Sequence, residues 1–496
     1  MAQELVPPPF PLSLPESKGL GWRLEPVNRR LPRVANGLHG GIYKSSGGLF
    51  YCIESVPEVS PEEQGFVSQL CFELSEALRS FPNAGSDKVD ELLSGLCSEI
   101  CADLGISLDA PQEKYLLEVA KMTALGFGPL EFFLEDEELE EVALAGNAPL
   151  TRVFAFHSRL GWLKTNVVVH DSDFAVSLAN KLASQLGRRL TLSKPTLNAS
   201  LPNGSRLHAA IPPVSFSGPS LTVRKFKKNP VTPPELASSK VLSFDALAFL
   251  WLALEGEANV LIAGNTGSGK TTTLNSLFCF VPRSERVVLV EETPEVNVLN
   301  EQKVRLLVNE DLGVSMNSLI LDTMRMRPDR VVVGEVRSAE EMKSFILTAL
   351  SGQGKGALAT MHAQSSQEAL SRLAGAGVPS RDLESIDLVV VQRRWSARSG
   401  NSFRELRRVV QVSEVAPGPS VDSFPEARDV FSFDFSRGRL KKNYSKSLTI
   451  SRHCQRNNVS RKAVLIELGK RSRFLEALSR KKKRFHQVAE AIESFK

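Results

Sequence analysis

The stretch Gly264-Asn-Thr-Gly-Ser-Gly-Lys270-Thr271 decides how this chain folds, because its glycine spacing is that of a loop that wraps phosphate groups. It lies between the apolar run 259–263 and the helix-compatible run 272–277. Glycines let backbone N–H groups turn toward phosphate oxygens, and the helix start adds a positive dipole. Lys270 supplies a positive charge and Thr271 a hydroxyl for Mg²⁺. We therefore expect nucleoside triphosphate binding rather than an ordinary glycine-rich turn.

Helical and apolar segments alternate on both sides of this loop from residue 241 onward. The pattern predicts a helix at 242–255 and strands at 260–263, 287–290, 331–333 and 357–361. These strands are apolar without alternation, which is typical of strands buried on both faces. We therefore predict an α/β fold with a doubly wound parallel sheet.

The remaining sequence changes composition several times along the chain. Shorter alternating segments and turns before residue 228 indicate an α+β domain, and a cluster of prolines after it indicates a linker. We predict six regions: a poorly ordered arm at 1–45, a helical subdomain at 46–122, an α+β domain at 123–228, a linker at 229–236, the phosphate-loop domain at 237–395, and a C-terminal extension with a basic helical tail at 396–496.

Composition places the chain among globular multidomain proteins, with 496 residues of which 42% are hydrophobic. No apolar run reaches the roughly 18–20 residues that span a bilayer, and the first residues lack a secretory signal, so we expect a cytoplasmic protein. Six scattered cysteines argue against a disulfide framework or a zinc ribbon.

Charge is distributed unevenly, because residues 431–496 contain 18 Lys/Arg and 5 Asp/Glu, or +13, within a chain of net charge +5. Leucines recur there at near-helical spacing, which favours a solvated helical bundle. The alternative is a surface for anionic lipid, an acidic partner or nucleic acid.

Polar residues follow three of the expected strands, at 290–295, 325–337 and 359–363. Ligands of open α/β sheets bind at the carboxyl ends of strands, where these residues should meet. Glu335 can hold Mg²⁺ through water or orient the attacking water, and Glu291 or Glu295 can polarise that water. His362 can contact the γ-phosphate; alternatively it is a hydrogen-bonded core residue.

Four ordered motifs, GNTGSGKT, VEETPE, RMRPDRVVVGEVR and ATMHA, resemble those of the type II/type IV secretion ATPase superfamily, over about half of the chain. The resemblance implies a RecA-like phosphate-loop domain preceded by an α+β domain, with helical N- and C-terminal extensions. It also implies a hexameric cytoplasmic ATPase, peripheral to the membrane, that uses ATP and Mg²⁺. Such enzymes power pilus, archaellum or secretion machines through a polytopic membrane platform protein.

The resemblance also assigns roles to individual residues. It makes Glu295 the expected catalytic base, with Glu335 supporting Mg²⁺ together with Thr271, and His362 in the histidine box. It implies that Arg206 and Arg224 reach the nucleotide, although a surface ion pair suits either arginine equally well. The nucleotide-binding residues are then Gly264, Asn265, Thr266, Gly267, Ser268, Gly269, Lys270, Thr271 and Thr272.

Two positions depart from the family pattern. Glu292 stands where relatives usually have aspartate, and Gln353 stands where histidine is common. The tetracysteine pairs of many bacterial members are absent, which favours the archaeal-type or tight-adherence-like branches.

Two other functions remain open. A nucleic-acid motor would use the basic tail, but few aromatic residues lie between the charges, so we do not expect nucleic acid as the partner. A nucleotide-dependent scaffold would bind ATP without hydrolysing it. Phosphate release distinguishes the scaffold from the motors.

Overall fold

The computed structural model describes residues 20, 22–25, 31–45, 47–54, 60–81, 85–146, 151–184, 188–201, 203–226, 229–309, 312–351, 354–399, 402–420, 423–481 and 483–495. Gln353 and the first 19 residues of the predicted arm lie outside the described residues. The chain divides into two compact units, Met1–Lys227 and Lys228–Lys496. Each unit has a sheet of its own.

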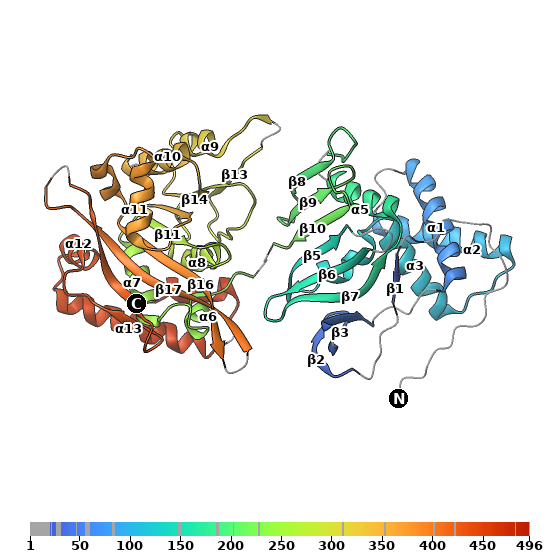
Figure 1. The fold of residues 1–496 in the computed structure, drawn as a ribbon, viewed down its shortest axis with the longest axis horizontal. Coiled ribbons are helices and arrows are strands. Elements are labelled where there is room, and N and C mark those ends of the chain that lie inside the picture. Colours follow the sequence, from blue (N-terminus) through green and yellow to red (C-terminus); the bar gives the residue numbers. More distant parts are fainter. Residues whose placement is uncertain are drawn as a thin grey trace. The chain divides into compact units, whose positions relative to one another are not determined.

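The first unit is built on a ten-stranded sheet (Figure 1). Its main path runs β2-β3-β4-β7-β6-β5-β10-β9-β8, and β1 pairs with β7. All pairs are antiparallel except β4 with β7. The strands are β1 (Trp22–Leu24), β2 (Arg33–Gly37), β3 (Gly40–Ser45), β4 (Gly48–Ile53), β5 (Leu139–Ala145), β6 (Thr151–His157), β7 (Gly161–Val169), β8 (Thr196–Ser200), β9 (Arg206–Ala210) and β10 (Ser220–Arg224).

Helices of the first unit pack into one hydrophobic core together with this sheet. They are α1 (Pro61–Arg79), α2 (Ser86–Leu104), α3 (Ala110–Ala124), the 3₁₀ turn η1 (Gly128–Leu130), α4 (Glu131–Leu134) and α5 (Ser172–Ser184). Ser60 and Glu63 form a capping box that starts α1, and buried Glu63 also accepts a hydrogen bond from Gln112 in α3. The first three helices therefore form a bundle tied by polar as well as apolar contacts.

The predicted boundaries at 1–45 and 46–122 are wrong in part. Within the described part of the arm, β1, β2 and β3 are strands, and β4 begins the region expected to be helical. Trp22 and Ile42 are buried in the core, so these short strands are held by packing. Proline- and glycine-rich composition hides such strands because the apolar residues that pack are few.

The second unit contains a nine-stranded sheet in the order β13-β12-β14-β15-β11-β16-β17-β18-β19. The first six strands of this order run parallel and the last three are added antiparallel. The predicted parallel sheet is confirmed. Its strands are β11 (Val260–Gly264), β12 (Val287–Glu291), β13 (Lys303–Leu307), β14 (Arg330–Val336), β15 (Ala357–Met361), β16 (Leu388–Ser399), β17 (Ser402–Ala416), β18 (Glu426–Asp434) and β19 (Arg439–Lys442).

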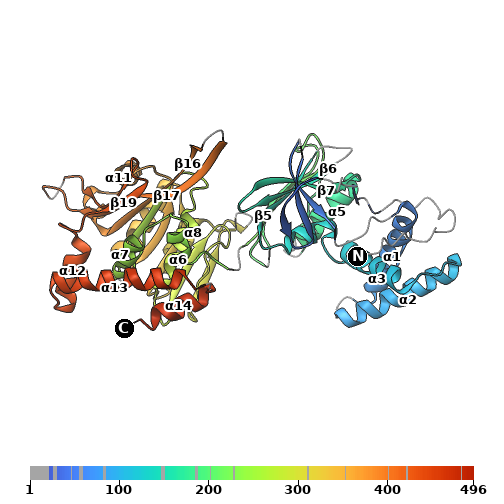
Figure 2. The ribbon, with the colours of Figure 1, turned by 90° about the horizontal axis from the view of Figure 1, so that it is seen from below.

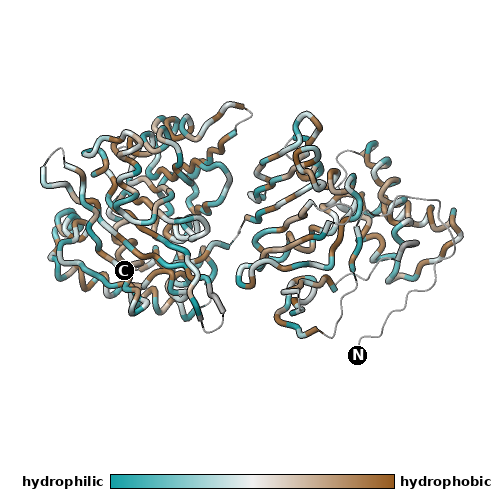
Figure 3. The backbone as a smooth tube through the Cα atoms, in the orientation of Figure 1, coloured by the Kyte–Doolittle hydropathy of each residue, from teal (hydrophilic) through white to brown (hydrophobic). Residues whose placement is uncertain are grey.

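Helices cover both faces of this sheet, as the doubly wound prediction requires. Successive residues of β11 point to opposite faces, so Ile262 joins one core cluster and Leu261 the other. One face holds α6 (Pro233–Ser238), α7 (Phe244–Glu255), α8 (Lys270–Leu277) and η2 (Phe278–Phe280). The other holds α9 (Met316–Thr323), α10 (Ala339–Leu350), α11 (Ser366–Gly375) and the 3₁₀ segment η4 (Ser380–Ser385). Figure 3 shows hydrophobic stretches along the strands between these layers.

Three C-terminal helices, the tail helices, pack on the second unit: α12 (Leu448–Asn457), α13 (Arg461–Ser479) and α14 (Phe485–Glu493). Figure 2 shows α13 beside α7, and α14 contacts η2. The guanidinium of Arg471 in α13 lies 4.5 Å from the ring centroid of Trp251 and pairs with Glu255 and Glu467. The tail is thus helical and basic, but its inner face is part of the core.

The predicted end of the phosphate-loop domain at residue 395 is also wrong. Strand β16 continues to Ser399, and β17, β18 and β19 extend the same sheet to Lys442. The linker prediction at 229–236 is wrong in its second half, because α6 begins at Pro233 with Thr232 as its N-cap. Proline suits the first helical position, where no backbone N–H is needed, so prolines here start a helix.

Candidate functional site

The predicted phosphate loop, Gly264–Thr271, joins the end of β11 to the start of α8. Gly267 and Gly269 have φ of +70° and +96°, which side chains other than glycine rarely adopt. A Cβ on Gly264 would lie 2.1 Å from the carbonyl oxygen of Gln392. The backbone therefore needs glycine at these positions, and the loop with the α8 N-terminus forms a cradle that fits a polyphosphate.

Lys270 is the buried cation of this cradle. Its Nζ donates to the Gly264 carbonyl at 3.3 Å and lies 3.7 Å from Oε1 of Glu335. Burial lowers the pKa of Lys270, while the charge of Glu335 opposes that shift. A buried lysine with one carboxylate partner is suited to bind an anion, because phosphate oxygens would supply the missing negative charge.

Glu335, near the end of β14, joins three cationic or ionisable side chains. Its Oε1 lies 2.8 Å from Nε2 of His362, which follows β15. Its Oε2 accepts from Nη2 of Arg337 at 2.7 Å, and Nη1 of Arg337 donates to Glu292 at 2.5 Å. Burial raises the pKa of Glu335, but the Arg337 hydrogen bond and the charges of Lys270, Arg337 and His362 outweigh it, so that pKa is lowered. Glu335 is therefore held as a carboxylate.

His362 is partly exposed and is not a residue of the core. Its side chain is 40% exposed and faces the Glu335 carboxylate. The structure thus brings Lys270, Glu335 and His362 together at the carboxyl ends of β11, β14 and β15, as the strand-end pattern predicts.

Glu291 and Glu295 have different environments. Glu291 is 1% exposed, and its Oε1 accepts the backbone N–H groups of Glu295 and Val296 at 2.8 and 2.9 Å. Its Oε2 pairs with Nε of Arg305 at 3.0 Å. Burial raises the pKa of Glu291. These contacts favour a positioning role for Glu291, which shapes the turn that carries the half-buried Glu295, rather than the role of general base.

The predicted Mg²⁺ residues belong to the same edge of the sheet. Thr271 is in the first turn of α8, directly after Lys270, and Lys270 contacts the Glu335 carboxylate. A hydroxyl and a carboxylate are the oxygen donors that Mg²⁺ takes beside phosphate. The donor set therefore fits Mg²⁺ bound with a nucleotide. Thr266 and Thr272 are exposed beside it.

Arg206 and Arg224 belong to the first unit, and the phosphate loop belongs to the second. They are directly opposite each other on β9 and β10, and both side chains are exposed. Like charges opposite each other in a sheet destabilise it unless an anion lies nearby. Glu141, opposite Arg224 on β5, supplies part of that charge.

Several residues of the site were not predicted. Gln392 of β16 donates to the Ser268 carbonyl at 2.6 Å and accepts from Thr273 at 2.6 Å. Arg305 and Arg337 neutralise the acidic residues of the site. Arg337 could have been predicted from the sequence, since it is two residues after Glu335. Gln392 and Arg305 could not, because they come close to the site only through the order of strands in the sheet.

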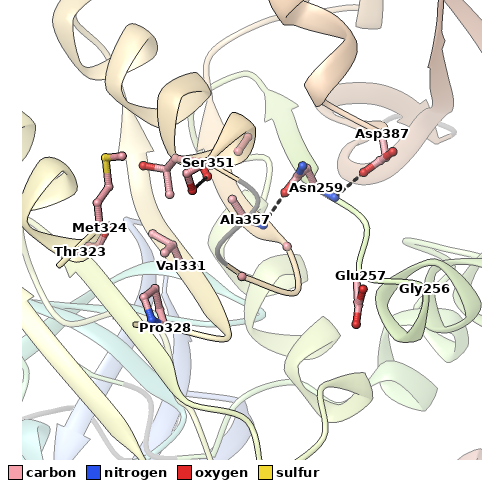
Figure 4. Close-up of a pocket in the computed structure, with 14 residues that line it drawn as sticks. Gly256, Glu257, Asn259, Thr323, Met324, Pro328, Val331, Ser351, Ala357 and Asp387 are labelled. Atoms are coloured by element: carbon pink, nitrogen blue, oxygen red, sulfur yellow. Dashed lines mark hydrogen bonds between the residues drawn. The ribbon is translucent and has the colours of Figure 1, made fainter. Parts of the chain in front are cut away.

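A pocket of about 300 Å³ lies at the opposite edge of this sheet (Figure 4). Asn259 before β11 accepts from the Ala357 backbone N–H at 2.7 Å, and its own N–H donates to Asp387 at 2.8 Å. These bonds tie together the amino ends of β11, β15 and β16. Ligands of such sheets bind at the carboxyl ends, so this pocket is not the candidate nucleotide site.

A sequence model described as "Type II/IV secretion system protein" matches residues 162–493, which include the phosphate loop and the strand ends of the second unit. The chain belongs to the type II/IV secretion system protein family. The fold class is confirmed with it: a RecA-like phosphate-loop sheet domain preceded by an α+β domain. No helix in the described part of this secretion-system family protein is both long and apolar enough to cross a bilayer.

Curated relatives of this secretion-system family protein include an uncharacterised protein of Methanocaldococcus jannaschii, 34% identical over 330 residues. That match covers 61% of this chain and 44% of the relative, so the chain spans less than half of that relative's length. The probable conjugal transfer protein TrbB of Sinorhizobium fredii is 29% identical over 296 residues, covering 58% of this chain and 86% of TrbB.

Solved structures that are similar to this chain include the VirB11 ATPase from the Brucella suis type IV secretion system, in complex with sulphate. It is 26% identical, covers 58% of this chain and 92% of its own, and has a TM-score of 0.30. The Legionella pneumophila ATPase DotB is 19% identical, covers 71% of this chain and 86% of its own, and has a TM-score of 0.42.

Proposed function

We propose that this protein is an ATPase that powers assembly or secretion by a type IV pilus-like or type II secretion machine. The observation that carries the proposal is the position of Glu335, which contacts Lys270, His362 and Arg337 at the mouth of the phosphate loop. Family membership supports the choice of machine. A second acid supports hydrolysis: Glu295 lies half-buried on the turn that Glu291 fixes, and its charge acts on Lys270.

Each residue has a role in this proposal. The loop N–H groups and Lys270 bind the polyphosphate, and Thr271 and Glu335 hold Mg²⁺. Bound Mg²⁺ would supply the positive charge that stabilises the transferring phosphoryl group. Glu295 takes the proton of the attacking water, with Glu291 fixing the turn on which Glu295 lies. His362 orients Glu335 and the terminal phosphate.

Assembly and location are part of the same proposal. We take the working form to be a hexamer in which Arg206 and Arg224 reach a bound nucleotide, and this would offset the repulsion between the two facing arginines. The ring would lie in the cytoplasm against the membrane and act on a polytopic platform protein. The exposed cations of the tail helices would contact anionic lipid.

Phosphate release by the purified protein tests the proposal. Lys270→Ala and Glu335→Gln should each lower turnover about a hundredfold, since the first removes the cation that binds the phosphates and the second removes a carboxylate that holds Mg²⁺. Glu340→Gln is the matched control, because Glu340 is an exposed acid in the first turn of α10. Arg206→Ala and Arg224→Ala should lower turnover as well.

Two additions to this assay distinguish the alternative functions. Stimulation by anionic vesicles would support the membrane-docked motor. Stimulation by single-stranded DNA alone, falling steeply with salt, would replace it with a nucleic-acid motor. Tight ATP binding without phosphate release in any condition would indicate a scaffold and contradict the hydrolytic proposal.

A further inference from the structure

Strand β16 contacts the phosphate loop through two of its residues, Gln392 and Arg394. The side chain of Asn265 donates to the Arg394 carbonyl at 2.9 Å and accepts the Arg394 backbone N–H at 2.9 Å. Two residues earlier, buried Gln392 bridges Ser268 in the loop and Thr273 in α8. The loop is therefore fixed to the middle of strand β16 as well as to its own helix.

An irregularity in the hairpin lies at this contact. The register between β16 and β17 shifts between Val391 and Gln392. Such bulges redirect side chains and increase the local twist of a strand pair. Beyond the shift, Gln392 and Arg394 share one face of β16, because alternate residues of a strand point the same way. That face is the one that meets the phosphate loop.

The guanidinium of Arg394 lies against the middle of the loop. A Cβ on Gly267 would be 2.5 Å from Nη1 of Arg394, and Gly267 itself is exposed. The side chain of Arg394 is 38% exposed. The phosphate loop therefore has two cations beside it: Lys270 inside the cradle, and the partly exposed Arg394, which belongs to the hairpin.

Glu405 of β17 holds this guanidinium. Its Oε1 accepts from Nε of Arg394 at 2.9 Å and from Nη2. Arg407 is directly opposite Arg394 in the strand register, so a second cation lies next to the Arg394–Glu405 pair. Nε of Arg407 is buried and has no hydrogen-bond partner among the described residues. This face of the hairpin thus has more positive than negative charge beside a loop that fits an anion.

We propose that Arg394 is a second cationic contact for the polyphosphate of a bound nucleotide, and that Glu405 competes with the nucleotide for it. The inference rests on the proposed function of the phosphate loop and adds a residue to it. Guanidinium groups bind phosphate oxygens through paired N–H donors, and such a bond replaces the one to a carboxylate without loss of geometry. Arg407 remains to pair with Glu405 when Arg394 leaves it.

Equilibrium binding of a fluorescent, non-hydrolysable ATP analogue to the full chain tests this inference without relying on turnover. Arg394→Ala should raise the Kd about tenfold, because one charge-assisted contact is lost. Glu405→Gln should lower the Kd about two- to fivefold, because the competitor of an exposed ion pair is removed. The double variant should bind like Arg394→Ala alone.

The two variants should change the Kd in opposite directions, and this distinguishes our inference from a purely structural role of the Arg394–Glu405 pair. If the Arg394–Glu405 pair only supports the loop, Glu405→Gln weakens binding as Arg394→Ala does, and the inference is overturned. Arg393→Ala is the matched control, because Arg393 is adjacent but on the other face of β16, and its Kd should change less than about twofold. If Arg394→Ala unfolds, Arg394→Gln and Glu405→Gln carry the same comparison.

Failure of the proposed function would look different. Absence of analogue binding by the unaltered protein and by every variant would contradict the phosphate loop as a nucleotide site. Normal binding that is abolished by Lys270→Ala but unaffected by Arg394→Ala and Glu405→Gln would contradict only the role of Arg394.

Discussion

Glu335 is the residue on which the charges of the site converge. Lys270, Arg337 and His362 all approach one carboxylate, whose own side chain is 21% exposed. Three partners on one acid keep it ionised and fix its direction, so a base or a metal-holding group is oriented before any ligand arrives.

This arrangement has a pH dependence with a definite sign. The pKa of Glu335 is lowered on folding, so its contribution to stability is complete above the ordinary glutamate pKa of about 4.3 and is lost as pH falls through the lowered value. Glu335→Gln should therefore reduce the free energy of unfolding by about 1–2 kcal/mol at pH 7. The difference should begin to shrink as the pH falls below about 4.3 and should approach zero only once the pH is below the lowered pKa of Glu335. Urea unfolding of both proteins at stepped pH measures it.

The control for this series is Glu340→Gln, which should match the unaltered protein at every pH. A Glu335→Gln difference that persists unchanged into acid would show that lost packing, rather than lost charge, is responsible.

Residues that touch phosphate in the proposed function could be predicted because chemistry restricts their type. A glycine-rich loop that ends in lysine at a helix start is specific for phosphate, and polar residues at the ends of apolar strands collect beside it. Lys270, Glu335 and His362 could therefore be expected to meet. Gln392 and Arg394 could not, since neither residue type is diagnostic and both come from a strand more than about a hundred residues away. Only the pairing of β16 with β11 makes them neighbours of the loop.

At the scale of elements, the tail helices show how a basic segment can be partly core. Arg471 is 8% exposed and covers the ring of Trp251 while two acids neutralise it. The aliphatic part of the side chain packs and the charge is paired, which is how arginine is accommodated in an interior. The positive charge of this region is therefore not entirely available to a partner.

Arg471→Ala should destabilise the protein by about 2 kcal/mol, because it removes a cation–π contact, the packing of a buried side chain and the ion pairs to Glu255 and Glu467. Chemical denaturation followed by tryptophan fluorescence measures the change. Arg473→Ala is the matched control: Arg473 is exposed on the same helix, and its loss should cost less than about 0.5 kcal/mol. Equal effects of the two variants would mean that α13 is not anchored by this contact.

Strands were predictable where both of their faces are buried. Residues 260–263, 287–290, 331–333 and 357–361 are almost entirely apolar and all belong to strands. Strands β17, β18 and β19 alternate apolar with charged residues or are short, and they follow the expected domain end. Their sequence pattern is typical of a half-exposed antiparallel sheet. Continuous apolar runs, which indicate buried parallel strands, do not occur in them.

At the scale of the whole molecule, the chain contains two separate sets of core residues. One core uses residues from Leu20 to Val223, and the clusters on either face of the second sheet use residues from Leu236 onward. The prolines between them indicated this division in the sequence, although the boundaries predicted within each unit were misplaced.

Two cores predict two unfolding transitions in differential scanning calorimetry of the full chain. Arg471→Ala should lower the midpoint of one transition only, and Leu93→Ala, which removes a buried side chain of the other core, should lower the other midpoint. A single transition that shifts with both variants would show that the two units unfold as one cooperative block.

The pairing of β7 also determines where the protein can be cut. The family match begins at residue 162, which is inside β7, a central strand bonded to β6 on one side and to β4 and β1 on the other. Truncation at that residue would remove every strand from β1 to β6 and leave backbone N–H and C=O groups of β7 unpaired along both edges. Such bare edges join to those of neighbouring molecules, so a recombinant fragment trimmed to the recognised family region should collect in inclusion bodies.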